Sequence, residues 1–252
     1  MKTELSQPSI NQLDDPNTTI THGKIIQSKP ILKAIYEDWY HQIITHLAPN
    51  SNKVLEIGSG GGFLKKKIPN LITSDILPLE ICDMTFSAEE MPFGNQELDA
   101  IVMVNVFHHI PKPFRFLSEA ERILKPGGRV IMIEPANTFL ARFIYKNFHH
   151  EPFDETGGWE IEAGKPLSHS NQALPFIYFL RDRQLLEKKF KNISIKKIDY
   201  HTPFTYILSG GLSRKSIIPI WLYPLFRKIE KIASPFHKIT GLFYTIVLEK
   251  KE

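Results

Sequence analysis

The feature that most constrains this chain is a short apolar run, residues 54–57, that leads directly into a turn holding Gly58, Gly60 and Gly62. The run has the length of a buried strand, and residues 63–67 are consistent with a first helical turn. Glycine has no Cβ and readily adopts positive φ, so a ligand can closely approach the backbone N–H groups of such a junction. The junction predicts an α/β fold that binds a ligand at the end of a strand.

The glycine spacing separates two classes of ligand that use such a turn. A dinucleotide-binding turn has the pattern Gly-x-Gly-x-x-Gly, but Phe63 occupies the third glycine position. The chain instead has Glu56 two residues before Gly58, and then glycines at alternate positions. This pattern resembles motif I of the class I S-adenosylmethionine (SAM) dependent methyltransferases. The cationic amino and sulfonium groups of SAM favour a nearby carboxylate, whereas the alternative for Glu56 is a strand-end acid that caps the next turn.

Residues 71–76 are predicted to form the next strand, with Asp75 at its C-terminal end. Ligands bind at such ends in open parallel sheets, and in the family that the glycine turn resembles an acid here binds the two ribose hydroxyls. The alternative is an aspartate that starts a loop through an Asx turn. Residues 77–81 are too few for a crossover helix before the next strand, so an irregular connection is expected.

Residues 87–93, Ser-Ala-Glu-Glu-Met-Pro-Phe, and the strand after them are similar to the Asp-Ala-Glu-x-Leu-Pro-Phe segment of small-molecule methyltransferases. The family's aspartate, which reads the adenine amine, is replaced here by Ser87. The adenine contact is then either weaker or passed to the backbone of Ala88, with Asp83 as a further option.

Residues 105–111, Asn-Val-Phe-His-His-Ile-Pro, are similar to the family segment that lies under the sulfonium. We expect His108 to line the site and His109 to be a loop residue. Adjacent histidines point in different directions, so no metal site is predicted here. The segment Leu-Lys-Pro-Gly-Gly at 124–128, ahead of an apolar strand at 129–135, is a further hallmark of the family.

These segments, in this order, predict an α/β fold with a Rossmann-like, seven-stranded class I methyltransferase sheet and helices on both faces. We expect a single domain over residues 1–252, with an N-terminal lid and helix (1–50), a SAM-binding core (51–135), a cap insertion (136–174), and the C-terminal half of the sheet with a second cap insertion (175–252). Further helices are expected at 29–47, 113–124, 138–148 and 175–190, and strands at 193–198 and 242–248, the last one antiparallel.

The resemblance implies contacts to SAM, or to its product S-adenosylhomocysteine, from Glu56, Gly58, Ser59, Gly60, Gly62, Phe63, Asp75, Ile76, Ser87, Ala88, Asn105, Val106 and His108. The catalytic residue is unknown, because alignment alone carries much of the rate for an activated sulfonium. Candidate bases are His108, His149, His150 and Tyr206. The loop after the helix expected at 138–148 could hold a metal or base cluster of His149, His150, Glu151 and Asp154. This interpretation is the weaker one, since the spacing matches no familiar ligand pattern.

The composition is that of an ordinary globular protein, with 42% hydrophobic and 23% charged residues. A single cysteine, Cys82, excludes an internal disulfide. The first residues lack the apolar core of a signal peptide, and no apolar run reaches the length of a membrane span. We therefore expect a cytoplasmic protein.

The charge is divided unevenly along the chain. Residues 1–179 hold 16 Lys and Arg against 21 Asp and Glu, whereas residues 180–252 hold 15 against 6. The basic part contains an apolar run, residues 217–226, which is either a packing element of a cap or part of a lipophilic pocket or a membrane-contacting surface. Five basic residues flank the run and suit peripheral contact with an anionic inner membrane face: Arg214, Lys215, Arg227, Lys228 and Lys231.

The expected function is SAM-dependent methyl transfer to an O, N or C atom of a small-molecule acceptor, with a lipophilic or lipid-linked compound as one option. The rival is a non-catalytic SAM-binding or regulatory protein of the same fold, for which Ser87 is a sign. Nucleic acid is not an expected partner, because residues 105–107 replace the Asn-Pro-Pro-Tyr-like motif of nucleic-acid methyltransferases. The sequence carries no signal for an oligomeric state.

Overall fold

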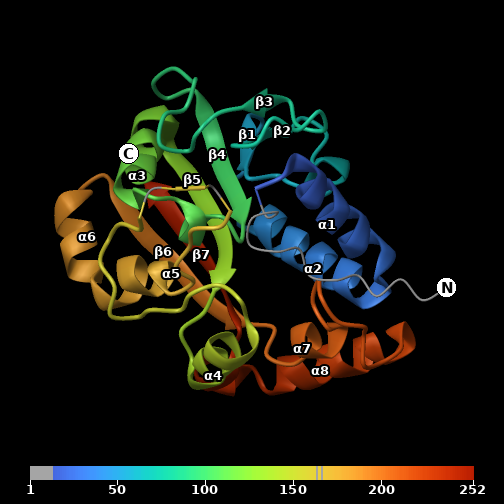
Figure 1. Cartoon of the computed structure of the whole chain (residues 1–252). Helices are drawn as coiled ribbons and strands as arrows, with labels where there is room; N and C mark the ends of the chain where they lie inside the picture. The colour runs from blue at the N-terminus through green and yellow to red at the C-terminus, as the bar shows by residue number, and fades with distance from the viewer. Residues whose placement is uncertain (1–13, 163, 166) are drawn as a thin grey trace.

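The computed structural model describes residues 14–162, 164–165 and 167–252, so the expectation about a signal peptide at the start of the chain lies outside the described residues. A seven-stranded sheet forms the centre, with the order β3-β2-β1-β4-β5-β7-β6 (Figure 1). Strand β7 runs antiparallel to both of its neighbours, and the remaining pairs are parallel. The predicted sheet is confirmed. The strands are β1 (Val54–Ile57), β2 (Ile72–Asp75), β3 (Met84–Thr85), β4 (Leu98–Val104), β5 (Leu124–Pro135), β6 (Ile193–His201) and β7 (Phe243–Lys250).

The core lies on both faces of the central strands. Residues 100–103 of β4 and 130–133 of β5 are fully buried, as expected where helices cover a parallel sheet on two sides. Figure 1 shows α1 (Pro16–Ser28) and α2 (Pro30–His46) on one side, and α3 (Pro113–Ile123) and α6 (Arg183–Lys189) on the other. Helix α2 matches its predicted range and buries Ile35, Trp39 and Ile43, spaced four residues apart.

Three local predictions differ from the structure. Residues 63–67 form only a 3-10 turn, η2 (Leu64–Lys66), because Pro69 follows too closely for a helix to continue. The predicted helix 175–190 is divided into α5 (Leu174–Phe176), a π-helical turn η4 (Ile177–Arg181) and α6. Strand β5 begins at Leu124 instead of residue 129, since Leu124 already pairs with Leu98 of β4.

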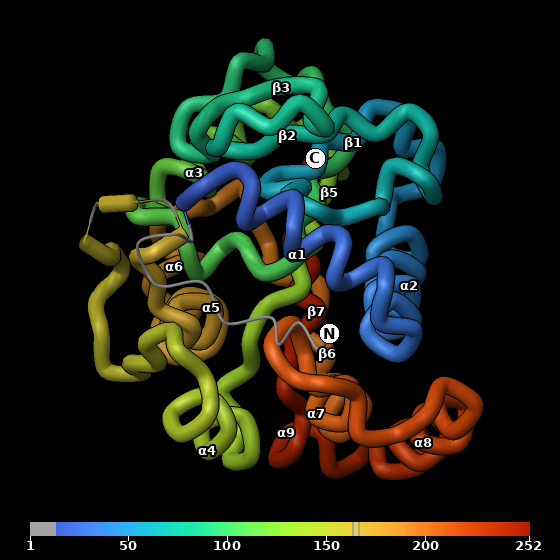
Figure 2. The backbone as a smooth tube through the Cα atoms, turned by 45° about the vertical axis from the view of Figure 1, so that its right-hand side comes forward, coloured from blue at the N-terminus to red at the C-terminus, as the bar shows by residue number. Residues whose placement is uncertain are grey.

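The remaining helices gather at one end of the sheet. In Figure 1 the arrows of β4 and β5 point toward this end, where α4 (Phe139–Phe148), α7 (Thr205–Ser209) and α8 (Tyr223–Ile232) lie. Figure 2 shows α9 (His237–Thr240) between α4 and α8. These helices come from the two predicted cap segments and stand at the carboxyl ends of the parallel strands. Within the described ranges, no helix is both long and apolar enough to cross a bilayer.

Candidate functional site

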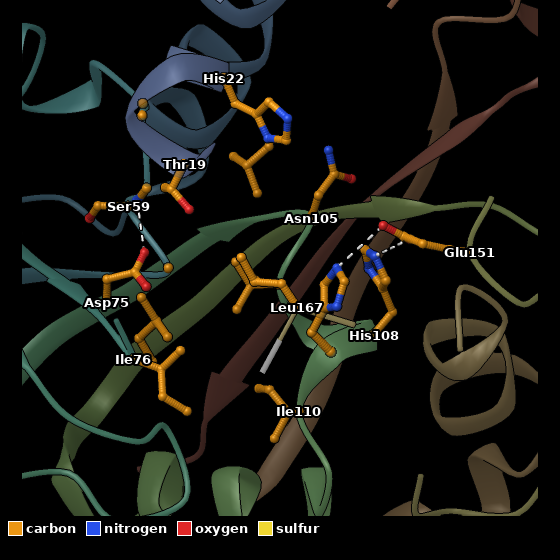
Figure 3. A pocket seen from close by; sticks show the side chains of 18 of the residues that line it. Thr19, His22, Ser59, Asp75, Ile76, Asn105, His108, Ile110, Glu151 and Leu167 are labelled. Atoms are coloured by element: carbon orange, nitrogen blue, oxygen red, sulfur yellow. Dashed lines mark hydrogen bonds and ion pairs between the residues drawn. The ribbon is translucent and has the colours of Figure 1, made fainter. Parts of the chain in front are cut away.

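A cavity of about 350 Å³ opens at the C-terminal ends of β1, β2 and β4, which is the size of a small-molecule site. Its walls come from the glycine turn, the loops after β2 and β4, helix α1 and the cap helices α4 and α7. Figure 3 shows Ser59 and Asp75 on one side and His108 and Glu151 on the other, with Asn105 between them. One ligand, or two adjoining ones, can therefore contact both groups.

Close packing requires the glycines of the turn. A Cβ on Gly58, which has a φ of +63°, would lie 2.4 Å from a methyl carbon of Val106. A Cβ on Gly61 would lie 2.2 Å from the Cα of Gly23 in α1. A Cβ on Gly62 would lie 2.8 Å from the carbonyl oxygen of Ser59. The glycines thus let α1 lie directly on the turn and leave the space beside it to a ligand.

Glu56 is a buried carboxyl group in the cavity wall. Burial raises its pKa to about 7, the nearby Asp75 adds to this rise, and a hydrogen bond from Ser59 opposes it. Glu56 forms no ion pair with any residue in the described part of the chain. A cationic group placed beside Glu56 would therefore stabilise its ionised form.

Asp75 ends β2 and ties the glycine turn to the loop after that strand. Its Oδ2 accepts a hydrogen bond from the N–H of Gly60 at 3.0 Å, and its Oδ1 accepts one from the N–H of Leu77 at 3.0 Å. The second bond is the Asx turn that the sequence left as an alternative, so the aspartate has this structural role as well as its place in the cavity. Burial raises its pKa, while these backbone hydrogen bonds oppose the rise.

Twelve of the thirteen predicted cofactor residues line this cavity, and Phe63 is the exception. Its ring packs against Tyr36 and Tyr40 in the core, and its N–H donates to the hydroxyl of Tyr40 at 3.1 Å. The assignment of Phe63 as a cofactor contact is therefore corrected, because the 3-10 turn directs its side chain inward.

Ser87 and Ala88 lie in the cavity wall, where the family resemblance puts the adenine. The hydroxyl of Ser87 accepts a hydrogen bond from the N–H of Glu89 at 3.2 Å. Asp83, the further option, does not line the cavity: its carboxylate pairs with Lys65 and accepts a hydrogen bond from the hydroxyl of Thr73 at 2.8 Å. The structure thus leaves Ser87 and the backbone of Ala88 as the adenine-side groups.

Helix α1 contributes to the cavity in a way that the sequence analysis missed. Thr19, His22 and Ile26 all line it, and Figure 3 shows Thr19 and His22 above the glycine turn. In this part of the chain, before the helix predicted at 29–47, we expected only a lid. Asp15 followed by Pro16 is the helix-start signal that could have revealed α1, since the Asp15 carboxylate caps the N–H of Asn17.

On the other side of the cavity, His108 is held between two carboxylates. Its Nδ1 lies 2.6 Å from Glu134 Oε2, and its Nε2 lies 3.3 Å from Glu151 Oε2. The second oxygen of Glu134 accepts hydrogen bonds from the N–H groups of Val106 and Phe107. Burial alone would lower the pKa of His108, but the two carboxylates outweigh it and raise the pKa to about 9. This pKa favours a protonated, hydrogen-bond-donating ring at neutral pH over a ring that acts as the resting general base.

Glu151 is the carboxylate that faces this side of the cavity, and the sequence analysis placed it only in a possible loop cluster. Burial would raise its pKa, but His108, His109 and His149 hold the pKa well below its usual range. His109, expected to be a plain loop residue, also lines the cavity. Ligand atoms of His108, His109 and Glu151 lie within 4.8 Å of one another, so these three residues could offer a metal site. A metal ion bound here would have to displace the proton on His108. The expectation that the chain binds no metal therefore stays a prediction.

The remaining candidate bases also line the cavity. Burial raises the pKa of Tyr206 to about 12, so its phenol keeps its proton at neutral pH. Burial lowers the pKa of His149, whose neutral ring has its Nδ1 2.6 Å from Gln172 Nε2. His150 stacks on His149 with 4.7 Å between ring centroids. Glu151, as an ionised carboxylate, and His149, as a neutral ring, can thus accept a proton.

The residues present fit the SAM that the sequence predicts. Burial makes Glu56 a carboxyl group that gains from a cationic partner, and a Cβ on Gly60 would occupy the space between Thr19 and Asp75 in the cavity wall. Asn105, between the two sides of the cavity, has a buried side-chain oxygen without a hydrogen-bond partner among the described residues. Glu56 and Asp75 would hold the amino and ribose groups, and Ser87 with Ala88 would flank the adenine.

Residues 55–132 match the methyltransferase domain family. A phthiotriol/phenolphthiotriol dimycocerosates methyltransferase of Mycobacterium ulcerans is 28% identical over 53% of this chain and 51% of that protein. The ubiquinone/menaquinone biosynthesis C-methyltransferase UbiE of Bartonella bacilliformis is 28% identical over 41% of this chain and 50% of that protein. The chain thus spans about half the length of these curated relatives.

Solved structures share the fold over nearly the whole chain. A methyltransferase of Haloferax volcanii, in complex with the Trm112 methyltransferase activator, has a TM-score of 0.57 at 12% identity and covers 95% of this chain and 97% of its own. A geranyl diphosphate C-methyltransferase of Streptomyces coelicolor, bound to S-adenosylhomocysteine, has a TM-score of 0.52 at 11% identity and covers 100% of this chain and 90% of its own. Residues 55–132 are thus a methyltransferase domain, and the whole chain has the fold of the class I SAM-dependent methyltransferases.

Proposed function

We propose that this protein transfers the methyl group of SAM to a small, lipophilic acceptor. One observation carries the proposal: a single cavity joins the glycine turn to a wall of apolar and aromatic side chains. These side chains come from α1, α4, β7 and the segment around α7: Ile26, Tyr145, Tyr206, Leu212 and Phe243. An apolar wall with a few polar groups at fixed places is the usual lining of a site for an organic molecule.

The names of similar proteins support a lipophilic acceptor. Two relatives are named as methyltransferases of phthiotriol/phenolphthiotriol dimycocerosates and of ubiquinone/menaquinone biosynthesis. The residues that match the methyltransferase domain family, 55–132, include most of the SAM half of the cavity.

Bound SAM would supply a methyl group already activated on a sulfonium, so the protein's main task is alignment. Holding the two reactants in line is worth up to about 7–11 kcal/mol. The acceptor atom forms its bond to the methyl carbon as the sulfur–carbon bond breaks, and a proton leaves the acceptor if it carries one. An acceptor atom that gains the methyl group while still carrying a proton becomes strongly acidic, so even the weakly basic Glu151 carboxylate, which pairs with the protonated His108, could take that proton.

Transfer of tritiated methyl groups tests the proposal. The purified protein is incubated with labelled SAM and, separately, with the chloroform–methanol and aqueous fractions of a bacterial extract. Label is expected in a product that partitions into the organic phase. The matched control is Gly60→Val, which fills the space beside Thr19 at a position with a φ of +47° and should remove the transfer.

Two other outcomes would overturn the proposal. Label confined to water-soluble products would refute a lipophilic acceptor. Absence of transfer to either fraction, with S-adenosylhomocysteine still bound in calorimetry, would favour the non-catalytic SAM-binding protein for which Ser87 is a sign.

A further inference from the structure

The helical layer at the cap end carries an unusual number of exposed large apolar side chains. Trp221, Ile232 and Phe139 are 73%, 72% and 72% exposed, whereas such residues are normally buried. They belong to what we call the apolar face, which spans α4, η5 (Ile220–Leu222), α8, η6 (Ser234–Phe236) and α9. Helix α4 packs against α9, and α8 leads through η6 into α9, so these elements adjoin (Figure 2). The face consists of Phe139, Phe143, Trp221, Ile232, Phe236 and Ile239.

Helix α8 has its amphipathic pattern reversed. Leu225, Ile229 and Ile232 follow one another at helical spacing and are all exposed, whereas Glu230 is buried. A helix on the surface of a globular protein normally turns its apolar stripe to the core. Here the apolar stripe points to solvent, and an acid points inward.

Specific hydrogen bonds fix this orientation. One carboxylate oxygen of Glu230 accepts from the N–H groups of Phe204 and Thr205 at 2.9 and 2.7 Å. The other accepts from Arg227 at 2.7 Å, and Arg227 also pairs with Asp38 at 2.7 Å. Arg227 is thus already paired with two carboxylates of the chain, which removes it from the five basic residues expected at a membrane. These bonds therefore hold the apolar stripe of α8 toward solvent.

The segments that carry the apolar face are basic, and the lysines of α8 and α9 share a pocket lining with one acid of a neighbouring strand, Asp199 of β6. Residues 136–150 and 202–242 contain a single acid, the buried Glu230. The exposed side chains of Lys228, Lys231 and Lys238 lie on α8 and α9. Among the residues that the structure describes, none of these lysines has an ion-pair partner within 4.0 Å. Arg214 and Lys215, in the loop before η5, add to the same charge.

We propose that the apolar face docks on an anionic lipid bilayer. Apolar side chains interspersed with lysines suit the boundary between acyl chains and anionic headgroups. A second copy of this chain is the less suitable occupant, because a symmetric contact would bring the lysines of the two copies together. Nucleic acid would meet the lysines but leave Trp221 and Ile232 in contact with water or phosphate.

The docking face is connected to the cavity. Tyr145 of α4 and Tyr206 of α7 line the acceptor wall, and Leu212 lies between α7 and η5. Helix α4 therefore contributes to both the acceptor wall and the face, and the segment from α7 to η5 links the wall to the rest of the face. This inference deepens the proposed function, because a lipophilic acceptor could then pass from the bilayer to the cavity without entering water.

Co-sedimentation of the full chain with vesicles tests the inference. Vesicles of phosphatidylcholine alone are compared with vesicles that also contain phosphatidylglycerol, at low and physiological salt. Binding is expected only with the anionic lipid and should weaken as salt rises. The variant Lys228→Gln/Lys231→Gln/Lys238→Gln should bind about a hundredfold more weakly, since each lysine near an anionic surface contributes about a fivefold factor.

A matched control carries the same loss of charge elsewhere. Lys67, Lys188 and Lys191 are exposed lysines outside the cap, and their replacement by Gln should leave vesicle binding unchanged. A second variant, Trp221→Ser/Ile232→Ser, removes apolar contacts and should also release the protein. Unchanged affinity for S-adenosylhomocysteine shows that each variant is folded.

Three results would overturn the inference. They are no binding to anionic vesicles at low salt, equal binding by the triple-lysine variant and its control, and a protein dimer that Trp221→Ser/Ile232→Ser dissociates. Failure of the methyl-transfer assay is a separate outcome. If the protein binds vesicles but labels no organic-phase product, the docking inference stands and the proposed lipophilic acceptor is refuted.

Discussion

The raised pKa of Glu56 has a direct consequence for the pH dependence of SAM binding. In the free protein burial raises this pKa to about 7, so below pH 7 most molecules carry a neutral carboxyl group. A bound cationic ligand favours the ionised carboxylate and lowers the pKa in the complex. Binding should therefore be strongest above pH 7 and weaken as the pH falls, while a proton is released on binding.

The size of the effect follows from this value. At pH 6 a group with a pKa of about 7 is about 90% protonated, so binding should release about 0.9 proton and the affinity should be about tenfold lower than its limit at high pH. This loss corresponds to about 1.4 kcal/mol. Glu56→Gln cannot ionise, so its affinity should be weaker by about 1–3 kcal/mol at pH 7.5 and nearly independent of pH between 5.5 and 7.

Calorimetry measures both quantities. Titrations with SAM at pH 6 in buffers of different ionisation enthalpy give the number of protons released, and a pH series gives the affinity. Equal pH dependence in wild type and Glu56→Gln would refute the assignment of Glu56 as the partner of the cationic group. Proton uptake on binding at pH 6 would have the wrong sign and refute it too.

Four further predictions concern other parts of the site. Asp75→Ala should weaken S-adenosylhomocysteine binding by about 1–3 kcal/mol in calorimetry, because charge-assisted bonds to the ribose are lost; unchanged affinity would place the ribose elsewhere. Ser87→Asp should retain or tighten SAM binding by restoring an acid beside the adenine amine, whereas lost binding in a folded variant would contradict the alignment of residues 87–93. Glu151→Gln should lower the pKa of His108 from about 9, seen by NMR of the imidazole, since one of its two carboxylate partners is removed; an unchanged pKa would mean that Glu134 alone sets it. Dialysis against EDTA should leave ligand affinity unchanged.

The core of the fold could be predicted because its signals are local. Glu56 and the alternating glycines identify a strand followed by a tight turn, and Asp75 identifies the end of the next strand. The short connection after Asp75 also revealed that no helix fits there. These features depend on residues close together in the chain, so they can be inferred from the sequence alone.

The acceptor side could not be predicted in the same way, because it depends on contacts between distant residues. His108 and Glu151 are 43 positions apart in the numbering, and only the folded cap brings Glu151 to 3.3 Å from the ring. The protonation of His108 depends further on Glu134, at the end of another strand. Likewise, the apolar run at 217–226 was compatible with a buried cap element, and only the structure shows that Ile217, Trp221 and Leu225 are exposed.

The central claim is that the cavity beside the glycine turn binds SAM, and a calorimetric titration with S-adenosylhomocysteine and, separately, NAD tests it most directly. The structure predicts one site per chain for S-adenosylhomocysteine at micromolar affinity, about −8 kcal/mol, loss of that binding in Gly60→Val, and no binding of NAD. Binding of NAD with no heat from S-adenosylhomocysteine would contradict the account.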